Sequence, residues 1–211
     1  SAMIEQGSPE WFAERLGKVT ASRVADVIAK TKTGPAASRA NYMAQLICER
    51  LTGEVAESFT SKEMQWGTDQ EPNARAAYEF RTDATVELIG FVPHPKIGDS
   101  GASPDGLVAA EGLIEIKCPN TATHIETLLG RAVPGKYITQ IQWQLACTGR
   151  QWCDYVSFDP RMPESMSLFV ARVDRDPKMI ADLEAEVFKF LDELAFKVAE
   201  LELRYSRKAA A

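Results

Sequence analysis

The chain has 211 residues, 45% of them hydrophobic, and a formal net charge of −6 at pH 7. A chain of this length and composition is expected to fold as one globular domain, here the whole of residues 1–211, with a core of ordinary size. No apolar run approaches the roughly 18 residues that a membrane-spanning helix needs, so the composition excludes a membrane protein.

The first half of the chain is expected to be mainly helical. Helix start and stop signals predict four helices. The first spans residues 8–16, the second begins at residue 20, the third ends at residue 53, and the fourth spans about 61–80. Ser8-Pro9 is typical of an N-cap with proline at the first helical position, and Gly53 of a helix end. Between the second and third helices, residues 31–38 are rich in Gly, Pro, Ser and Thr and are expected to form a loop.

The second half is expected to alternate strands with helices, as in an α/β domain. Strands are predicted near residues 85–92, 106–109, 113–118, 153–158 and 167–173, and helices near 123–129, 136–148 and 177–205. The last helix carries an apolar stripe that predicts either core packing or a subunit interface; its members are Ile180, Leu183, Val187, Leu191, Leu194, Val198 and Leu201.

The ends of the sequence contribute little to this prediction. Ser1 and Ala2 stand before Met3 and are expected to be an expression remnant, and Ala209–Ala211 carry no information about the fold. No signal-peptide segment opens the chain, which favours a protein of the cytoplasm.

The segment from Ser103 to Lys117 holds the residues best suited to chemistry. It contains Pro104-Asp105 and, further on, Glu115-Ile116-Lys117. Because alternate side chains of a strand share a face, Glu115 and Lys117 point together while Ile116 points into the core. If Asp105 begins the neighbouring strand, its carboxylate meets that of Glu115, and carboxylate oxygens are the ligands that Mg²⁺ and Mn²⁺ prefer. The pattern therefore predicts a metal-dependent nuclease site.

Each half of this motif also has a simpler interpretation. Pro104–Gly106 could form an ordinary turn, and Glu115 and Lys117 could be a solvated pair on an edge strand. The apolar residues on either side of Ala109–Gly112 resemble the two arms of a hairpin, and they therefore favour the nuclease site over these simpler interpretations. A hairpin would place the two acids side by side.

Cysteine and histidine are poor candidates for the chemistry. The four cysteines show no Cys-x-x-Cys spacing, and only two histidines are present; these residues are Cys48, Cys118, Cys147, Cys153, His94 and His124. Zinc is therefore not expected, the thiols are expected to be reduced and mostly buried, and both histidines are expected to be structural.

The net negative charge is unevenly distributed. Residues 15–39 contain six basic residues and one acid, Asp26, whereas residues 176–202 contain eight acids and three lysines. The basic stretch could neutralise phosphates on one face while the acidic helix faces solvent or a neighbouring subunit. A solvated run of charge is an equally good interpretation.

Six ordered segments give the chain a specific resemblance. From Trp11 to the end of the last helix it resembles the lambda exonuclease family, the phage-type alkaline exonucleases of the PD-(D/E)xK nuclease superfamily. The segments that carry the resemblance are Arg15–Gly17 with Thr20–Ser22, Trp66-Gly67 with Glu71–Arg75, Ser103–Gly106, Glu115–Pro119, Tyr137-x-x-Gln140-x-Gln142 and Asp159–Met162. The resemblance implies a central mixed β-sheet flanked by helices.

The resemblance also implies roles for individual residues. Asp105, Glu115 and the backbone carbonyl of Ile116 match metal ligands, and Lys117 matches the lysine that orients or activates the attacking water. Glu71 matches an acid near the metals, with a solvated helix glutamate as the alternative. Residues three apart share a helix face, and Tyr137 and Gln140 match the motif that flanks the catalytic strand, although Tyr137 could simply pack. The residues that match the binding site for a terminal 5′-phosphate are Arg15, Ser22, Ser103 and Gln140.

The resemblance implies that the protein digests linear double-stranded DNA from 5′ to 3′, with one or two Mg²⁺ or Mn²⁺ ions as cofactor. Two ions would lie about 3.5–4 Å apart. The products would be 5′-mononucleotides and a 3′ single strand for phage recombination. The family also implies a homotrimer, a single-strand annealing partner protein, no membrane contact and a phage or prophage gene expressed in the bacterial cytoplasm. Two other classes of function stay open, a restriction-type endonuclease and a catalytically silent DNA-binding module.

Overall fold

The computed structural model describes residues 2–56 and 60–206, so Ser1 and Ala209–Ala211 lie outside the described residues. Its first elements are α1 (Pro9–Arg15), β1 (Val19–Thr20), the 3₁₀ helix η1 (Ala21–Arg23), α2 (Val24–Ile28), β2 (Lys30–Thr31), β3 (Gly34–Pro35), α3 (Ala37–Thr52), α4 (Lys62–Thr82), β4 (Val86–Glu87) and β5 (Val92–Pro93). They are followed by β6 (Ser100–Ala102), β7 (Gly106–Val108), β8 (Gly112–Lys117), α5 (Thr121–Gly130), α6 (Gly135–Thr148), β9 (Trp152–Phe158), the 3₁₀ helix η2 (Glu164–Met166), β10 (Leu168–Asp174) and α7 (Pro177–Tyr205).

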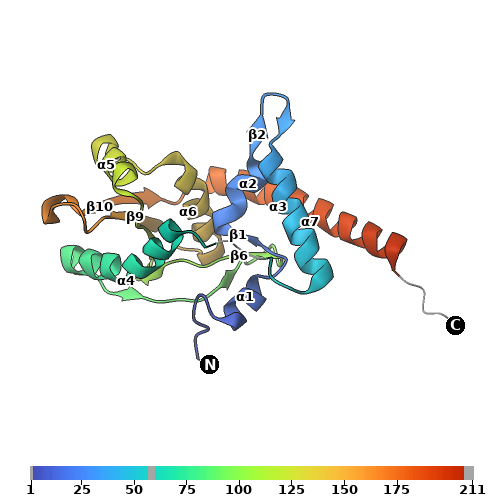
Figure 1. The fold of residues 1–211 in the computed structure, drawn as a ribbon, viewed down its shortest axis with the longest axis horizontal. Coiled ribbons are helices and arrows are strands. Elements are labelled where there is room, and N and C mark those ends of the chain that lie inside the picture. Colours follow the sequence, from blue (N-terminus) through green and yellow to red (C-terminus); the bar gives the residue numbers. More distant parts are fainter. Residues whose placement is uncertain (1, 57–59, 207–211) are drawn as a thin grey trace.

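A five-stranded mixed sheet lies between helices (Figure 1). Its strand order is β10-β9-β8-β7-β4, and only the β8–β9 pair is parallel. Ile114 and Ile116 of β8 pack with Ala74 and Tyr78 of α4. Leu113 belongs to a separate cluster that includes residues of α6. This alternation places α4 and α6 on opposite faces of the sheet, and the expected mixed α/β architecture is confirmed.

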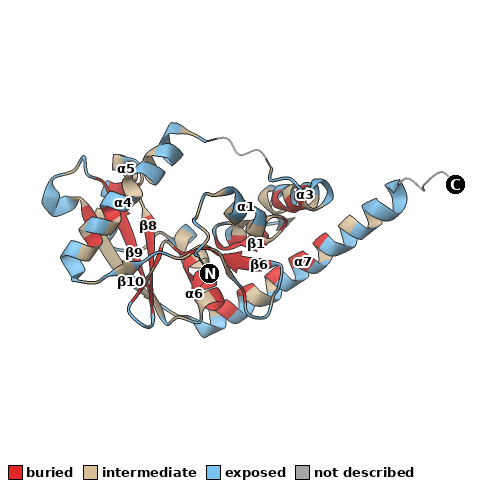
Figure 2. Cartoon of the chain, turned by 90° about the horizontal axis from the view of Figure 1, so that it is seen from below, coloured by how far each residue is buried: buried red, intermediate tan, exposed pale blue. Residues whose placement is uncertain are grey.

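A second packing unit joins the small sheet β1-β6-β5 to the helices α2, α3, α6 and α7. The last helix supplies much of its core, with Val187, Phe190 and Leu194 fully buried. The predicted stripe is confirmed as core from Ile180 to Leu194, whereas Leu201 is exposed. Figure 2 shows why: the C-terminal half of α7 extends away from the rest of the chain.

The predicted strand at residues 85–92 is wrong as a single element. β4 pairs with β7 in the large sheet, and β5 pairs with β6 in the small sheet. The chain between them must leave one sheet for the other, and Gly90 lies there against the backbone of Ile4, where a Cβ would meet the carbonyl oxygen at 2.7 Å. Hydrophobicity alone gave no sign of this change of partner.

Two other predictions need correction. The helix expected from residue 20 begins with the 3₁₀ turn η1 and becomes α-helical at Val24. The expected loop at 31–38 contains the hairpin of β2 and β3, closed by a bond from the Thr31 hydroxyl to the Gly34 carbonyl oxygen at 3.0 Å, and α3 already begins at Ala37. β6 was missed, because Ser-Gly-Ala has little strand propensity.

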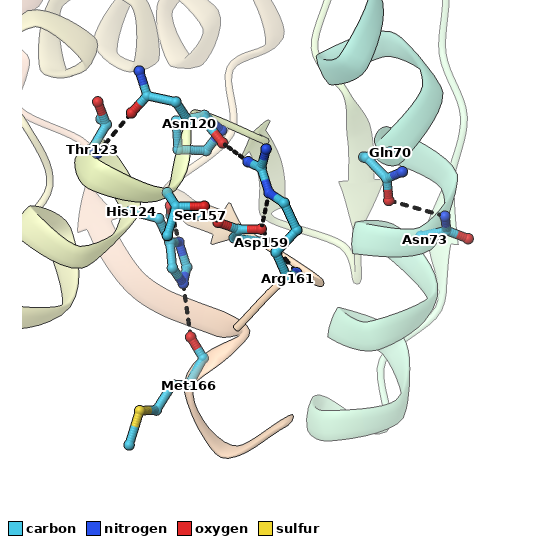
Figure 3. A network of polar contacts seen from close by, with 11 residues as sticks. Gln70, Asn73, Asn120, Thr123, His124, Ser157, Asp159, Arg161 and Met166 are labelled. Carbon is cyan, nitrogen blue, oxygen red and sulfur yellow. Dashed lines mark hydrogen bonds and ion pairs between the residues drawn. The ribbon is translucent and has the colours of Figure 1, made fainter. Parts of the chain in front are cut away.

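The cysteines and histidines occupy structural positions. Cys118, Cys147 and Cys153 are buried and Cys48 is exposed, all as free thiols. His124 is fully buried, and its ring nitrogens contact the Ser157 hydroxyl at 2.7 Å and the Met166 carbonyl oxygen at 2.8 Å (Figure 3). Across residues 2–56 and 60–206, no helix has the length and apolarity needed to cross a membrane.

Candidate active site

The β7–β8 hairpin places two acids at one end of the large sheet. Gly106 pairs with Ile114, and Asp105 immediately precedes β7. The Asp105 Oδ2 atom accepts the backbone N–H of Ile116 at 2.7 Å, which ties the first acid to the strand that carries the second. The predicted hairpin is confirmed. The edge-strand alternative is wrong, because β8 lies between β7 and β9.

Glu115 is held by three donors inside the protein, where its residue is only 2% exposed. Its Oε1 atom accepts from Lys117 Nζ and from Gln140 Nε2, each at 3.1 Å. Its Oε2 atom accepts from Gln144 Nε2 at 2.8 Å. Charged and amide donors on both oxygens fix the carboxylate in one orientation.

Lys117 lies on the same face of β8 as Glu115, as predicted from the alternation of the strand. Its ammonium also donates to Gln140 Oε1 at 3.3 Å and lies 4.7 Å from the centre of the Tyr137 ring. Tyr137 stacks in turn on Tyr155 of β9, with 5.7 Å between ring centres. The structure thus brings both Tyr137 and Gln140 of α6 to Lys117. Tyr137 contacts the lysine and also packs against Tyr155.

Glu71 of α4 is a third acid, near enough to Asp105 and Glu115 for their charges to interact. Its Oε1 atom lies 4.0 Å from an Arg75 guanidinium nitrogen. Burial raises the pKa of Glu71, an effect that Arg75 opposes and the charge of Glu115 reinforces. Burial and the charges of Glu115 and Glu71 likewise raise the pKa of Asp105 well above its ordinary value. The pKa values of Asp105 and Glu71 therefore both depend on the charge of Glu115 in a poorly solvated site.

One half-buried cation, Lys117, partly offsets these acids. Burial acts to lower the pKa of Lys117, but the charges of Glu115 and Asp105 outweigh it and raise that pKa above its ordinary value. Lys117 therefore stays an ammonium at neutral pH. The site still carries more potential negative charge than positive, which is the electrostatic condition under which a divalent cation binds.

The donors present fit a hard divalent ion. Across residues 2–56 and 60–206, no three Asp, Glu, His or Cys side chains converge closely enough to hold a metal by themselves. Mg²⁺, however, is commonly held by one or two carboxylates and keeps several waters. Asp105, Glu115 and the carbonyl of Ile116 would supply such oxygens, without a nitrogen or sulfur ligand. That these groups and Glu71 bind a metal stays a prediction.

A small pocket beside these acids contains all four residues expected to bind a 5′-phosphate. Its volume is about 170 Å³, and Arg15, Ser22, Ser103 and Gln140 all line it. The guanidinium carbon of Arg15 lies 3.8 Å from the centre of the Trp11 ring, and Trp11 Nε1 donates to Ser103 Oγ at 3.0 Å. We call this space the terminal pocket. Its residues are brought together as predicted, and their roles stay predictions.

A larger cavity of about 580 Å³ adjoins the terminal pocket, and Trp11 and Gln6 line both. Glu71, Arg75 and Asp105 line the larger cavity as well. A molecule in the terminal pocket would therefore lie next to the acids. Gln6 fixes this junction, because its Nε2 atom donates to the carbonyl oxygens of Ile89 and Pro104, each at 2.8 Å.

Gln144 was not predicted as a site residue, whereas Gln142 belongs to the family motif but lies outside the site. Gln144 is completely buried and holds Glu115, four residues along α6 from Gln140 and hence on the same helix face. Gln142 instead donates to the Asp174 carbonyl oxygen and accepts the Asp176 N–H, so it joins α6 to the start of α7. The helical spacing of Gln140 and Gln144 was the signal that could have identified the right pair.

The arrangement of the sheet and helices defines a class, the PD-(D/E)xK fold. Similarity to a solved structure supports this fold: a phage related exonuclease from Haemophilus somnus 129PT superimposes with a TM-score of 0.71 at 15% identity, covering 87% of this chain and 96% of that one. No curated protein sequence matches the chain.

Closer matches show the family. Residues 10–151 match the YqaJ-like viral recombinase domain. The chain is 54% identical to LHK-Exo, an alkaline exonuclease from Laribacter hongkongensis, whose crystal structure superimposes with a TM-score of 0.88. Its complex with dAMP gives 0.89, and in both cases the match covers 93% of this chain and 97% of that one. The chain belongs to this family of alkaline exonucleases of the lambda exonuclease type, and its role is that of a nuclease in recombination.

Proposed function

We propose that the protein digests one strand of linear double-stranded DNA from its 5′ end, releasing 5′-mononucleotides and leaving a 3′ single strand for phage recombination by strand annealing. The observation that carries this proposal is the position of the terminal pocket, which opens beside Asp105 and the buried Glu115. A DNA end held by its terminal phosphate in that pocket would present its first phosphodiester to the acids. Phosphate contacts position a strand without reading bases, so digestion would be independent of sequence.

Each residue has a defined task in this proposal. Arg15, with the hydroxyls of Ser22 and Ser103, binds the terminal phosphate through a charged fork and neutral donors. Lys117 places an ammonium beside the phosphodiester and orients the attacking water. Gln140 lines the terminal pocket and contacts both Glu115 and Lys117, so it joins recognition of the end to hydrolysis.

We propose Mg²⁺ as the cofactor, with Mn²⁺ as a substitute and one or two ions bound. Asp105, Glu115 and the Ile116 carbonyl would hold the ion, and Glu71 would assist. A divalent ion supplies positive charge to the transition state and acidifies water. The protein's own contribution is to keep both carboxylates fixed and to hold Lys117 charged between them and the substrate.

The dAMP complex of LHK-Exo supports this choice of product, because dAMP is a deoxynucleoside monophosphate. We further propose that the protein acts in the cytoplasm of a bacterial host, is encoded by a phage or prophage, assembles as a homotrimer around DNA and hands the remaining strand to a single-strand annealing protein. These proposals rest on the family to which the chain belongs.

End-labelled DNA tests the proposal. The substrates are linear duplexes with a 5′-phosphate or a 5′-hydroxyl, and a closed circular duplex of the same sequence, each with Mg²⁺ or with chelator. We expect Mg²⁺-dependent release of 5′-mononucleotides, faster from phosphorylated ends, and an intact circle. Nicking of the circle would favour a restriction-type endonuclease, absence of any cleavage would favour a silent DNA-binding module, and equal rates at both ends would refute the terminal pocket.

A further inference from the structure

A third cavity, lined by polar residues, adjoins the active site at Tyr137. Its volume is about 450 Å³, and its wall includes Lys62, Trp66, Pro119, Lys136, Tyr137 and Arg161. We call it the basic cavity. Three cations line it, against a single acid, Glu63. None of its residues has a role in the catalytic centre except Tyr137, which contacts Lys117.

Three helices begin at the basic cavity. Lys62 is the first residue of α4, Asn120 is the N-cap of α5, and Lys136 is the second residue of α6. Helix N-termini carry partial positive charge and unpaired N–H groups. Side chains cap α4 and α5, but no side chain caps α6. The helix dipoles and the side chains therefore favour the same kind of ligand, an anion.

Arg161 is held in place before any ligand arrives. Its Nε atom donates to Asp159 Oδ1 at 2.8 Å, and its Nη2 atom donates to the Pro119 carbonyl oxygen at 3.1 Å (Figure 3). Asp159 is completely buried and is further fixed by the Thr121 hydroxyl at 2.6 Å. Such an arginine loses little conformational entropy on binding an anion, because its rotamer is already chosen.

Trp66 supports Arg161 from a second side. The guanidinium carbon of Arg161 lies 4.3 Å from the centre of the Trp66 ring. A guanidinium over an indole ring gains cation–π attraction. Arg161 is therefore fixed both by its hydrogen bonds and by the aromatic wall of the basic cavity.

The order of residues along α6 fixes where the basic cavity lies relative to the reaction. Tyr137 lines the basic cavity, Gln140 contacts Lys117 and Glu115, and Gln144 lines the terminal pocket. These residues are about 4.5 and 6 Å apart along the helix axis. Along α6, the residue that contacts both Lys117 and Glu115 therefore lies between the basic cavity at Tyr137 and the wall of the terminal pocket at Gln144.

We propose that the basic cavity binds the phosphates of the digested strand on the 3′ side of the scissile phosphodiester. This inference rests on the proposed function, in which the terminal pocket holds the 5′-phosphate. A strand fixed at its end and cut at the catalytic centre continues past it, and its next phosphates then meet Lys62, Lys136 and Arg161. Holding the strand on both sides of the cut aligns the phosphodiester.

A pair of exposed lysines provides the test. The double variant Lys62→Ala/Lys136→Ala is compared with wild type and with a matched control, Lys178→Ala/Lys189→Ala on the exposed face of α7. Release of the first labelled nucleotide is measured on two phosphorylated duplexes. One is natural, and the other carries neutral methylphosphonates at the second and third linkages of the digested strand.

On natural DNA we expect the double variant to raise KM roughly tenfold and to reduce the slope of log KM against log salt by about 1 to 2. On the neutral duplex the double variant should match wild type, because the linkages that the lysines would contact carry no negative charge. Arg161→Lys, which keeps the charge but loses the fork, should raise KM on natural DNA only. Its melting temperature reports any effect on folding.

Two results separate the possible failures. If wild type releases no 5′-nucleotide from either duplex, the proposed function fails. If wild type cleaves but the double variant behaves like the control on natural DNA, or loses as much on the neutral duplex, the basic cavity does not bind the strand and the inference is overturned.

Discussion

Gln144 shows how a single buried side chain can set the geometry of an acid. It donates to Glu115 Oε2 at 2.8 Å and is itself fully buried. Gln144→Leu would leave a buried carboxylate oxygen without its donor, a loss of about 1–3 kcal/mol. We expect kcat/KM for duplex digestion to fall at least tenfold while the fold is kept.

Gln142→Leu is the matched control for this variant, because Gln142 lies on the same helix but bonds to the backbone at the start of α7. It should lower the free energy of unfolding and leave kcat/KM within about twofold. Equal kinetic effects of the two substitutions would show that Gln144 does not position Glu115.

Asp159 gives the protein a pH-dependent contribution to stability. Burial acts to raise its pKa, but bonds from Arg161 and Thr121 outweigh burial and lower that pKa below the ordinary 3.8. A carboxyl group with a lower pKa in the folded state stabilises the fold above its unfolded pKa and loses this contribution as the pH falls through the folded pKa. Asp159→Asn should therefore destabilise the protein at pH 7.

The difference in unfolding free energy between wild type and Asp159→Asn, measured by urea denaturation, should be constant from pH 7 to about 5 and shrink below pH 3.8. A difference that grows on acidification would contradict the assigned direction. The same residue holds Arg161 in the basic cavity, so this measurement also reports how firmly that arginine is fixed.

Residue-level prediction from the sequence succeeded where a short local pattern sets geometry. Alternation along β8 was enough to place Glu115 and Lys117 together, because strand periodicity is local. The burial of Glu115 and its bonds to α6 could not be predicted that way, since they depend on which helix covers that face of the sheet. Gln144 was missed for the same reason.

Among the elements, α7 carries the clearest energetic prediction. Leu194 is fully buried in the cluster with α2 and α3, whereas Leu203 on the extended end is 77% exposed. Leu194→Ala should lower the free energy of unfolding by about 2–5 kcal/mol, and Leu203→Ala by no more than about 0.5 kcal/mol. Chemical denaturation of both variants checks this, and similar losses would contradict the packing of α7.

Element boundaries followed from capping residues. Ser8 caps α1 and Gly53 ends α3 in the left-handed region, as predicted. Ser61, near which the fourth helix was expected to start, caps α4. The small sheet could not be predicted, because its strands are two or three residues long and gain stability only from neighbours distant in sequence. Val19 of β1, for example, pairs with Ser100 of β6.

At the scale of the whole molecule, the acidic helix α7 contacts part of the basic N-terminal region. Arg39 of α3 bonds to Glu193 of α7 at 2.8 Å. Part of the basic stretch is therefore neutralised within the fold. Arg15, in the terminal pocket, is the member of that stretch that our proposal assigns to DNA.

The proposed homotrimer predicts processive digestion. Sedimentation should give the mass of three chains, and an excess of unlabelled competitor DNA added after digestion has begun should not slow release from the labelled duplex, because a ring stays on its strand. A monodisperse monomer, or immediate arrest by competitor, would contradict the ring.

In the proposed mechanism, Asp105 and Glu115 hold a divalent ion against the phosphodiester, and Lys117 orients the attacking water. The most direct test is Mg²⁺-dependent release of labelled nucleotide from a phosphorylated linear duplex by wild type, Asp105→Asn and Glu115→Gln, with Glu87→Gln on the edge strand β4 as control. We expect both site variants to lose at least about a thousandfold in rate, several kcal/mol of barrier, with unchanged circular dichroism. Digestion at the wild-type rate by either folded variant would contradict the claim.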